Sequence, residues 1–175
     1  PVSSPSVSFS AVNESVSCQS STGSIGTASE QIYVENPDAA DNGWTVSLAA
    51  TSGPTASWGS AGTDMDFNDP TGSTAGCADG ADSDSISGLL TVDPSSASVG
   101  TGQCLSCTTN NISLGSQSSY NEGTIDSITI FNAAAASDDV GDWTMQDIDL
   151  TQQIPPSQPA AGDYDIDMTL SIVAN

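Results

Sequence analysis

The chain has 175 residues, with 22 Asp and Glu but no Lys, Arg or His, so its formal net charge is -22 at pH 7. A chain without basic side chains cannot neutralise phosphates, so we expect no nucleic-acid partner. It also lacks the His and Lys that Ser-His-Asp, Cys-His and Schiff-base chemistry require, and no pair of carboxylates is marked by an apolar pocket. We therefore expect a protein that is not an enzyme.

Cysteine usage and the absence of a long apolar run indicate an extracellular protein. No stretch of about 18 apolar residues is present, so we expect no membrane-spanning segment. The chain starts at Pro1 rather than Met, which suggests a removed signal peptide. The four cysteines Cys18, Cys77, Cys104 and Cys107 predict two structural disulfides in an oxidising compartment. We prefer disulfides to a redox or zinc role for the C-x-x-C pair, because no helical context and no second close pair accompany it.

The first 13 residues have the alternation of a half-buried strand, with Val7, Phe9 and Ala11 on one face and serines on the other. Pro5 restricts such a strand to a sheet edge or to an exchanged position. We treat residues 1–13 as an N-terminal extension that could be donated to a neighbouring copy.

Short strand-like segments with turn signals between them fill the middle of the chain. We expect strands in residues 30–36, 43–51, 86–94, 110–116 and 124–132. In the second of these, Trp44, Val46, Leu48 and Ala50 share one face and predict a core strand. Trp58 is expected in the core or at a sandwich edge.

Two segments near the C-terminus carry further apolar patterns. In residues 142–155 the alternation slips by one residue between Met145 and Ile148, which predicts a bulge or a strand break. Residues 163–174 form the clearest strand pattern. Its apolar face holds Tyr164, Ile166, Met168, Leu170 and Ile172, and its opposite face begins with Asp163, Asp165 and Asp167. We interpret these aspartates as a solvated edge that blocks unwanted sheet pairing, with a second row of cation ligands as the alternative.

Eight to ten short strands and no segment of helical period predict an all-β fold. We expect residues 14–175 to form a single antiparallel β-sandwich, Ig-like or pilin-like, with an acidic loop inserted in it.

The acidic loop, residues 63–85, is dense in carboxylates and has no cation to balance them. Its spacing does not match an EF-hand, but oxygen ligands from both limbs suit Ca²⁺, which takes six to eight oxygens in flexible geometry. We expect structural Ca²⁺, and the candidate ligands are Asp64, Asp66, Asn68, Asp69, Asp79, Asp82 and Asp84. A solvated loop without an ion is the alternative.

Two N-x-S sequons begin at Asn13 and Asn111. Such sequons arise often by chance in a chain rich in Ser and Thr, so both are candidate rather than assigned glycosylation sites.

Several motifs resemble those of a known family of proteins. They include GWTVSLAATSGPTASW, the acidic DFNDPTG and GCADGADSDS, and LTQQIPPSQPAAGDYDIDMTLSIVAN. With these motifs the chain resembles secreted β-sandwich surface proteins of uncultivated bacteria and, more distantly, WxL-type surface domains. It departs from the WxL pattern because Trp44 is followed by Thr45 and Val46. Its C-terminal turn and strand are similar to those of pilin-like subunits that polymerise by strand donation.

The same resemblance implies a disulfide pairing of Cys77 with Cys107 and of Cys18 with Cys104, while the two other connectivities stay open. It also leads to two functional hypotheses. In the first, the chain is a subunit of an extracellular filament or cell-surface layer, and its partners are copies of itself, joined by strand donation. In the second, it is a monomeric, Ca²⁺-dependent module that binds cell-wall or surface glycan, with Trp58 as the aromatic platform.

Overall fold

The computed structural model describes residues 5–37, 42–59, 63–71, 75–80, 82–138 and 140–175. The described residues form short strands and one 3₁₀ turn. The elements are β1 (Gln19–Ile25), β2 (Ile32–Asn36), β3 (Trp44–Ala50), β4 (Leu89–Asp93), η1 (Pro94–Ser96), β5 (Ser98–Thr101), β6 (Ile112–Leu114), β7 (Ser118–Ser119), β8 (Ser127–Ala133), β9 (Gly141–Gln146), β10 (Ile148–Ile154) and β11 (Met168–Ala174). The five segments predicted as strands in the middle of the chain each overlap one of these strands.

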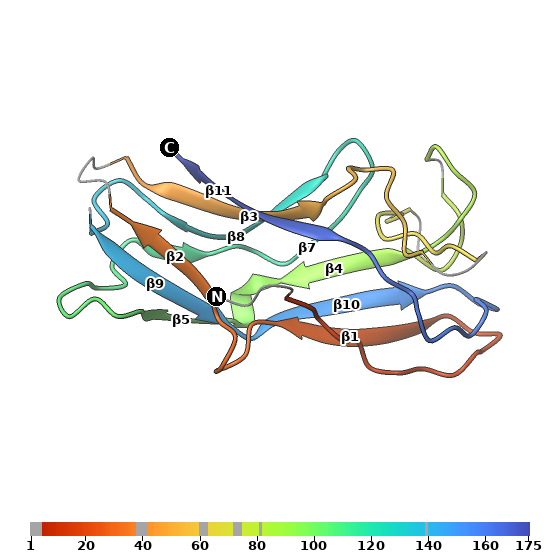
Figure 1. Ribbon diagram of the computed structural model, residues 1–175. Helices are drawn as coiled ribbons and strands as arrows, with labels where there is room; N and C mark the ends of the chain where they lie inside the picture. The colour runs from red at the N-terminus through yellow and green to blue at the C-terminus, as the bar shows by residue number, and fades with distance from the viewer. Residues whose placement is uncertain (1–4, 38–41, 60–62, 72–74, 81, 139) are drawn as a thin grey trace.

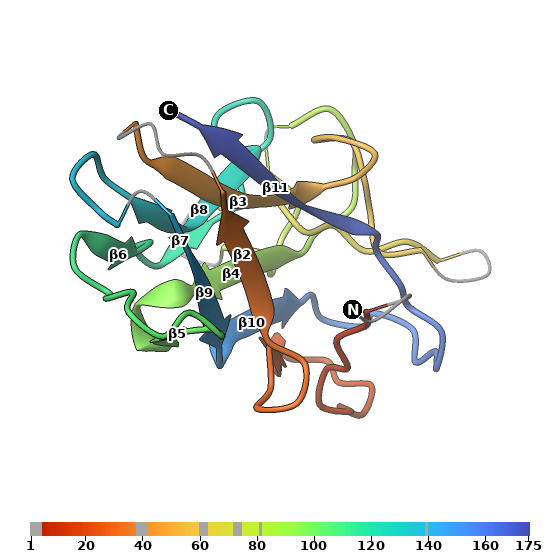
Figure 2. The same ribbon diagram turned by 60° about the vertical axis from the view of Figure 1, so that its left-hand side comes forward.

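The strands form antiparallel sheets in two layers. One layer is the sheet β11-β3-β8-β6, and the other holds the sheets β1-β10-β4-β7 and β2-β9-β5. Figure 1 shows β11, β3 and β8 lying over β10, β4 and β1, and in the turned view of Figure 2 β11 and β3 again lie over β4 and β10. The prediction of an all-β antiparallel fold is confirmed. The two layers form an open sandwich, because β11, β1 and β2 each end a sheet on the side that faces the viewer in Figure 1.

The core lies between the layers, and β3 is at its centre. Alternate residues of β3, among them Trp44, Val46 and Leu48, are buried, as the sequence predicts. The ring centroid of Trp44 lies 5.1 Å from that of Phe131 in β8 and 5.5 Å from that of Trp143 in β9. Aromatic contacts therefore join the two layers.

The predicted break between Met145 and Ile148 is confirmed. Both side chains are fully buried, and they belong to successive strands, β9 and β10. Asp147 between them has φ 64°, and its N–H donates to the carbonyl of Gly26. In a regular strand, Ile148 would point away from the core, because it follows the inward-pointing Met145 by three residues. The left-handed backbone of Asp147 turns the chain so that Ile148 points inward as well.

The C-terminal segment forms a shorter strand than its pattern predicts, because β11 begins only at Met168. In its register with β3, Leu170 faces Leu48 and Ile172 faces Val46. Directly paired residues share one face of a sheet, so Leu170 and Ile172 lie on the face of this sheet that points to the core. They are nevertheless 43% and 54% exposed, whereas Leu48 and Val46 are buried. The second layer does not cover β11.

The N-terminal segment is irregular where the alternation predicts a strand. Residues 5–18 contain no strand, and their backbone contact with β1 is a bond from the Ser10 N–H to the Thr22 carbonyl. Phe9 is half-buried and packs edge-on against Trp58, with ring centroids 5.3 Å apart. Val7 is 37% exposed. The segment thus lies beside β1 without becoming a regular strand of the same molecule.

Candidate functional site

The acidic loop leaves the sandwich at one end of the molecule, where Figure 1 draws it in yellow and green. Three predicted ligands from its two limbs converge. Asp66, Asp69 and Asp82 each offer one carboxylate oxygen, and these oxygens all lie within 4.8 Å of one another. Asp79, Asp82 and Asp84 form a second group by the same distance, so Asp82 belongs to both. Asp66 and Asp69 are 1% exposed, whereas Asp79 and Asp84 lie on the surface.

The other two predicted ligands, Asp64 and Asn68, differ in burial. Asp64 is exposed and has no place in either cluster of the described residues. Asn68 is buried, but its Nδ2 donates to the carbonyl of Pro54 at 2.7 Å. The sequence placed Asp64, Asp66 and Asn68 together by their spacing of two. In the structure, the amide nitrogen of Asn68 bonds to the neighbouring turn at Pro54, and its role as a ligand stays a prediction.

Backbone pairing positions the first limb of the cluster. The N–H of Asp66 donates to Ser87, that of Leu90 to Phe67, and that of Asp69 to Gly88. Gly88 has φ 151°, and a Cβ at this position would lie 1.9 Å from the Asp66 carbonyl oxygen. Only glycine allows this close approach. The first limb of the loop is therefore held against the start of β4.

Each of the three converging aspartates uses one carboxylate oxygen, Oδ1, in local hydrogen bonds. Oδ1 of Asp66 accepts from the N–H groups of Phe67 at 2.7 Å and Asn68 at 3.3 Å. Oδ1 of Asp69 accepts from the hydroxyl of Thr71 at 2.6 Å. Oδ1 of Asp82 accepts from the N–H of Asp84 at 3.2 Å. These bonds fix the orientation of all three carboxylates.

Burial makes a negative charge unfavourable in this cluster. Burial raises the pKa of Asp66 to about 7, although hydrogen bonds from Phe67 and Asn68 lower it, and the charges of Asp84 and Asp82 raise it further. The pKa of Asp82 is also raised, first by burial and then by nearby carboxylates that include Glu122. The cluster gathers negative charge in a place that disfavours it.

A disulfide tethers the acidic loop, but not to the predicted partner. Cys77 bonds with Cys18, and their Cα atoms lie 5.5 Å apart. The expected pairs Cys77–Cys107 and Cys18–Cys104 are therefore wrong. Cys18 directly precedes β1, whose Gln19 pairs with Ile154 of β10. A Cβ on Gly76 would lie 2.8 Å from the Cβ of Gln153, so the same part of β10 brings both cysteines together.

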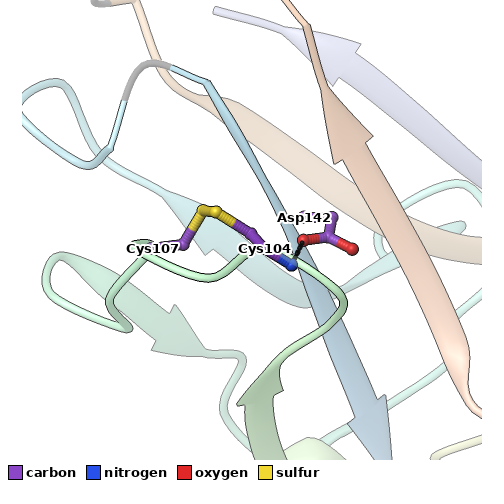
Figure 3. Close-up of side chains that lie close together, drawn as sticks. All are labelled: Cys104, Cys107 and Asp142. Atoms are coloured by element: carbon purple, nitrogen blue, oxygen red, sulfur yellow. Dashed lines mark hydrogen bonds between the residues drawn. A yellow bond between two sulfur atoms is a disulfide. The ribbon is translucent and has the colours of Figure 1, made fainter.

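The remaining cysteines pair with each other, which confirms two disulfides. Cys104 and Cys107 close a short turn with Cα atoms 5.6 Å apart. Figure 3 shows Asp142 beside this turn. Its carboxylate accepts from the N–H groups of Gln103 at 2.6 Å and Cys104 at 2.7 Å, and from the Tyr33 hydroxyl at 2.6 Å. Because their sulfur atoms are bonded to each other, the cysteines are not available as thiolate metal ligands.

Asp142 is a structural residue that the sequence did not mark. Its buried carboxylate joins β2, β9 and the disulfide turn. The hydrogen bond from Tyr33 is the main cause that lowers the pKa of Asp142, and in return it raises the pKa of Tyr33 to about 12. The partners lie far from Asp142 in the chain, so no local pattern could have found this contact.

The open side of the sandwich forms a groove between the sheet edges. Its volume is ≈ 790 Å³, and its lining includes the uncovered face of β11 together with Leu48 of β3, Leu90 of β4 and Leu150 of β10. Val7 and Phe9 of the N-terminal segment also line it. Core side chains of both layers therefore line the groove, next to the segment that the sequence singled out for assembly. Ala11, the third residue of that pattern, is exposed.

Both sequons lie on the surface. Asn13 and Asn111 are exposed. Nδ2 of Asn111 donates to the carbonyl of Ala136 at 2.6 Å, so a glycan on this nitrogen would have to replace that bond. Glycosylation of either asparagine stays a prediction.

Comparison with protein families, with curated proteins and with solved structures found no match. The resemblance to secreted surface proteins and WxL-type domains therefore stays a prediction. Among the described residues, no helix has the length and apolar character needed to cross a bilayer. The two disulfides are typical of proteins from oxidising compartments.

Proposed function

We propose that this protein is a structural subunit of an extracellular filament or surface layer, in which residues 5–13 of one copy occupy the groove of the next. The observation that carries this proposal is the uncovered inner face of β11. Leu170 and Ile172 face inward by register but remain about half exposed, whereas their partners on β3 are buried. An inserted strand would cover these two side chains and extend the layer that lies opposite β11.

An extended peptide suits this groove better than a compact ligand. The strands that border it, β11, β1 and β2, are edge strands, and each presents backbone donors and acceptors along its open side. A peptide in β conformation binds to such an edge with main-chain hydrogen bonds, while its alternate side chains enter apolar positions. The alternation of Val7, Phe9 and Ala11 matches that requirement.

A second copy is the proposed source because the N-terminal segment is complementary to the groove and forms no regular strand in its own molecule. It touches the groove through Val7 and Phe9. Residues 1–13 carry no acidic side chain, so their transfer to a neighbour of charge -22 adds no repulsion. Exchange would replace the backbone and side-chain bonds of Ser10 to β1 and the packing of Phe9 against Trp58, but no regular strand pairing.

The glycan-binding alternative has less support in the geometry. It needs an accessible aromatic platform, but Phe9 packs edge-on against Trp58, and the Trp58 indole N–H donates to Gln152 at 2.9 Å. A glycan would have to displace Phe9 from this position. Titration of cell-wall glycans with and without EDTA checks this alternative directly.

Electron microscopy and gel filtration of the purified protein test the proposal. We expect the full chain to form filaments or layers, and deletion of residues 1–12 to give monomers with a retained β-sheet circular dichroism spectrum. Full-length protein that stays monomeric, or filaments that persist after the deletion, would overturn strand donation.

A matched pair of substitutions on β11 tests the groove itself. Ile172→Asp places a charge on the face that points into the groove. Val173→Asp places the same charge on the opposite face, at a side chain of similar exposure, 61% against 54%. We expect Ile172→Asp to abolish assembly and Val173→Asp to retain it. Equal assembly by both variants would contradict the proposal.

A further inference from the structure

The three converging aspartates contain carboxylate oxygens that the protein itself does not satisfy. The Oδ2 atoms of Asp66, Asp69 and Asp82 are buried and have no hydrogen-bond partner among the described residues. Asp66 and Asp69 are each 1% exposed, so water has little access to them from the surface. A buried carboxylate oxygen without a partner is costly, and these three belong to residues whose carboxylates converge.

The composition of the chain narrows what could satisfy these oxygens. In most proteins a buried carboxylate pairs with Lys, Arg or His, but this chain has none. A proton or a metal ion is left as the positive partner. Three oxygens within 4.8 Å of one another suit a metal ion better than separate protons, because one cation contacts all three at once.

We propose that Asp66, Asp69 and Asp82 bind a calcium ion through their unpaired Oδ2 atoms. Ca²⁺ prefers carboxylate and carbonyl oxygens, tolerates irregular geometry and completes its shell with water. Mg²⁺ requires a near-ideal octahedron and usually keeps several of its waters, which a nearly closed cluster does not favour. Asp79 and Asp84 form the outer group around Asp82 and raise the local concentration of cations.

The ion would join two limbs that the backbone holds separately. Asp66 and Asp69 belong to the limb that pairs with residues 87–90, and Asp82 belongs to the limb whose Ser83 bonds with Glu122. The Cys18–Cys77 disulfide ties the chain between the limbs to the start of β1. Calcium would thus close a loop that already has a covalent anchor. This site is separate from the groove, so its test does not depend on filament formation.

Calorimetric titration of EDTA-treated protein in 150 mM NaCl tests the proposal. We expect one saturable Ca²⁺ site with a Kd at or below about 1 mM, the range of extracellular calcium modules. A hundredfold excess of Ca²⁺ over Kd should raise Tm by about 5–10 °C, because ligand that binds only the folded state stabilises it. Mg²⁺ at the same concentration should have a smaller effect.

Charge-matched variants separate this site from diffuse binding to an acidic surface. Asp66→Asn and Asp69→Asn each remove one charge inside the cluster, and we expect each to weaken Ca²⁺ binding at least about tenfold. Asp167→Asn removes one charge from an exposed residue outside the cluster and should bind as the unmodified protein does. Asp82→Asn, at a less buried position, serves if the other two variants fail to fold.

The stability of Asp66→Asn provides a second readout, because its difference from the unmodified protein should change sign when Ca²⁺ is added. Without Ca²⁺ at pH 7, Asp66→Asn should be as stable as the unmodified protein or more stable, because it removes a buried charge. With Ca²⁺ it should be the less stable of the two. Non-saturable binding, Ca²⁺ affinity unchanged in Asp66→Asn and Asp69→Asn, or equal affinity for Mg²⁺ would each overturn the assignment.

Discussion

Asp142 illustrates how one buried carboxylate can organise distant segments of a chain that has no basic side chain. Backbone N–H groups of Gln103 and Cys104 and the hydroxyl of Tyr33 take the place that a Lys or Arg would have elsewhere. Charged acceptors form stronger hydrogen bonds than neutral ones, so these contacts favour the ionised form. The structure therefore satisfies Asp142 with its own donors, unlike the Oδ2 atoms of Asp66, Asp69 and Asp82.

The lowered pKa of Asp142 predicts a pH-dependent contribution to stability. A folded-state pKa below the ordinary 3.8 stabilises the fold above pH 3.8, and this contribution is lost as the pH falls through the folded value. Asp142→Asn should therefore be less stable than the unmodified protein at pH 7, and the difference should shrink below pH 4. Denaturant titrations at pH 7, 5, 3 and 2.5 measure it.

Tyr33→Phe provides the companion variant, because it removes a donor and keeps the charge. It should destabilise the fold in the same direction and by less than Asp142→Asn, since the Gln103 and Cys104 bonds remain. A difference between Asp142→Asn and the unmodified protein that stays constant down to pH 2.5 would contradict this role of the carboxylate.

Gly88 fixes the backbone beneath the aspartate cluster. A Cβ would lie 1.9 Å from the Asp66 carbonyl oxygen, so Gly88→Ala forces the paired segments apart. We expect this change to lower the free energy of unfolding by about 1–3 kcal/mol. Gly162→Ala is the control, because no described atom lies within 4 Å of its added Cβ. It should change stability by less than about 0.5 kcal/mol, and a similar loss in both variants would refute the steric explanation.

At the scale of elements, local patterns predicted strands well and failed where a contact between distant segments decides the outcome. The inward alternation of β3 and the phase slip at Asp147 could be predicted, because side-chain direction follows directly from the two-residue period of a strand. The exposure of β11 could not, because its pattern is the same whether or not a second layer covers it. Burial of that face depends on the width of the opposite layer.

The two disulfides close loops of very different length, and this difference predicts unequal effects on stability. Cys18 and Cys77 are 59 positions apart, whereas Cys104 and Cys107 are three apart. In the chain-entropy account, removal of the first costs about 4 kcal/mol and of the second about 2 kcal/mol. Denaturant unfolding of the Cys18→Ser/Cys77→Ser and Cys104→Ser/Cys107→Ser proteins measures both. A larger loss from the short loop would show that local packing around Asp142 outweighs chain entropy.

The candidate metal site was predicted in part. Sequence spacing identified the acidic loop and all three converging aspartates, Asp66, Asp69 and Asp82. It also included Asp64 and Asn68, because their spacing of two from Asp66 places oxygen ligands at alternate positions. The backbone pairing of residues 66–69 with 87–90 directs the Asn68 side chain to Pro54 and leaves Asp64 exposed. Spacing alone does not report which carboxylates are buried.

At the scale of the whole molecule, charge of a single sign dominates. With a net charge of -22 and no basic residue, the folded state concentrates repulsion that the unfolded chain relieves. Salt screens this repulsion, because the Debye length falls from about 30 Å at 0.01 M to about 8 Å at 0.15 M. The same screening should allow subunits to approach one another.

The charge predicts that stability and assembly both increase with salt. In EDTA-containing buffer, we expect Tm to rise by several degrees between 10 mM and 150 mM NaCl, and light scattering to show faster assembly over the same range. Sucrose at equal osmolality is the control, since it is excluded from the protein surface but does not screen charge. A Tm that stays constant or falls with NaCl would contradict a dominant role for repulsion.

The sequence by itself determined the class of fold, the position of most strands, the break at Asp147 and the acidic loop, because these follow from local alternation and composition. Tertiary structure alone decided the pairing of Cys18 with Cys77, the burial of Asp66 and Asp69, and the open groove beside β11. Each of these depends on which strand edges meet in space. Side-chain direction is set by neighbours in the chain, whereas burial and pairing are set by residues that lie 59 positions or more away.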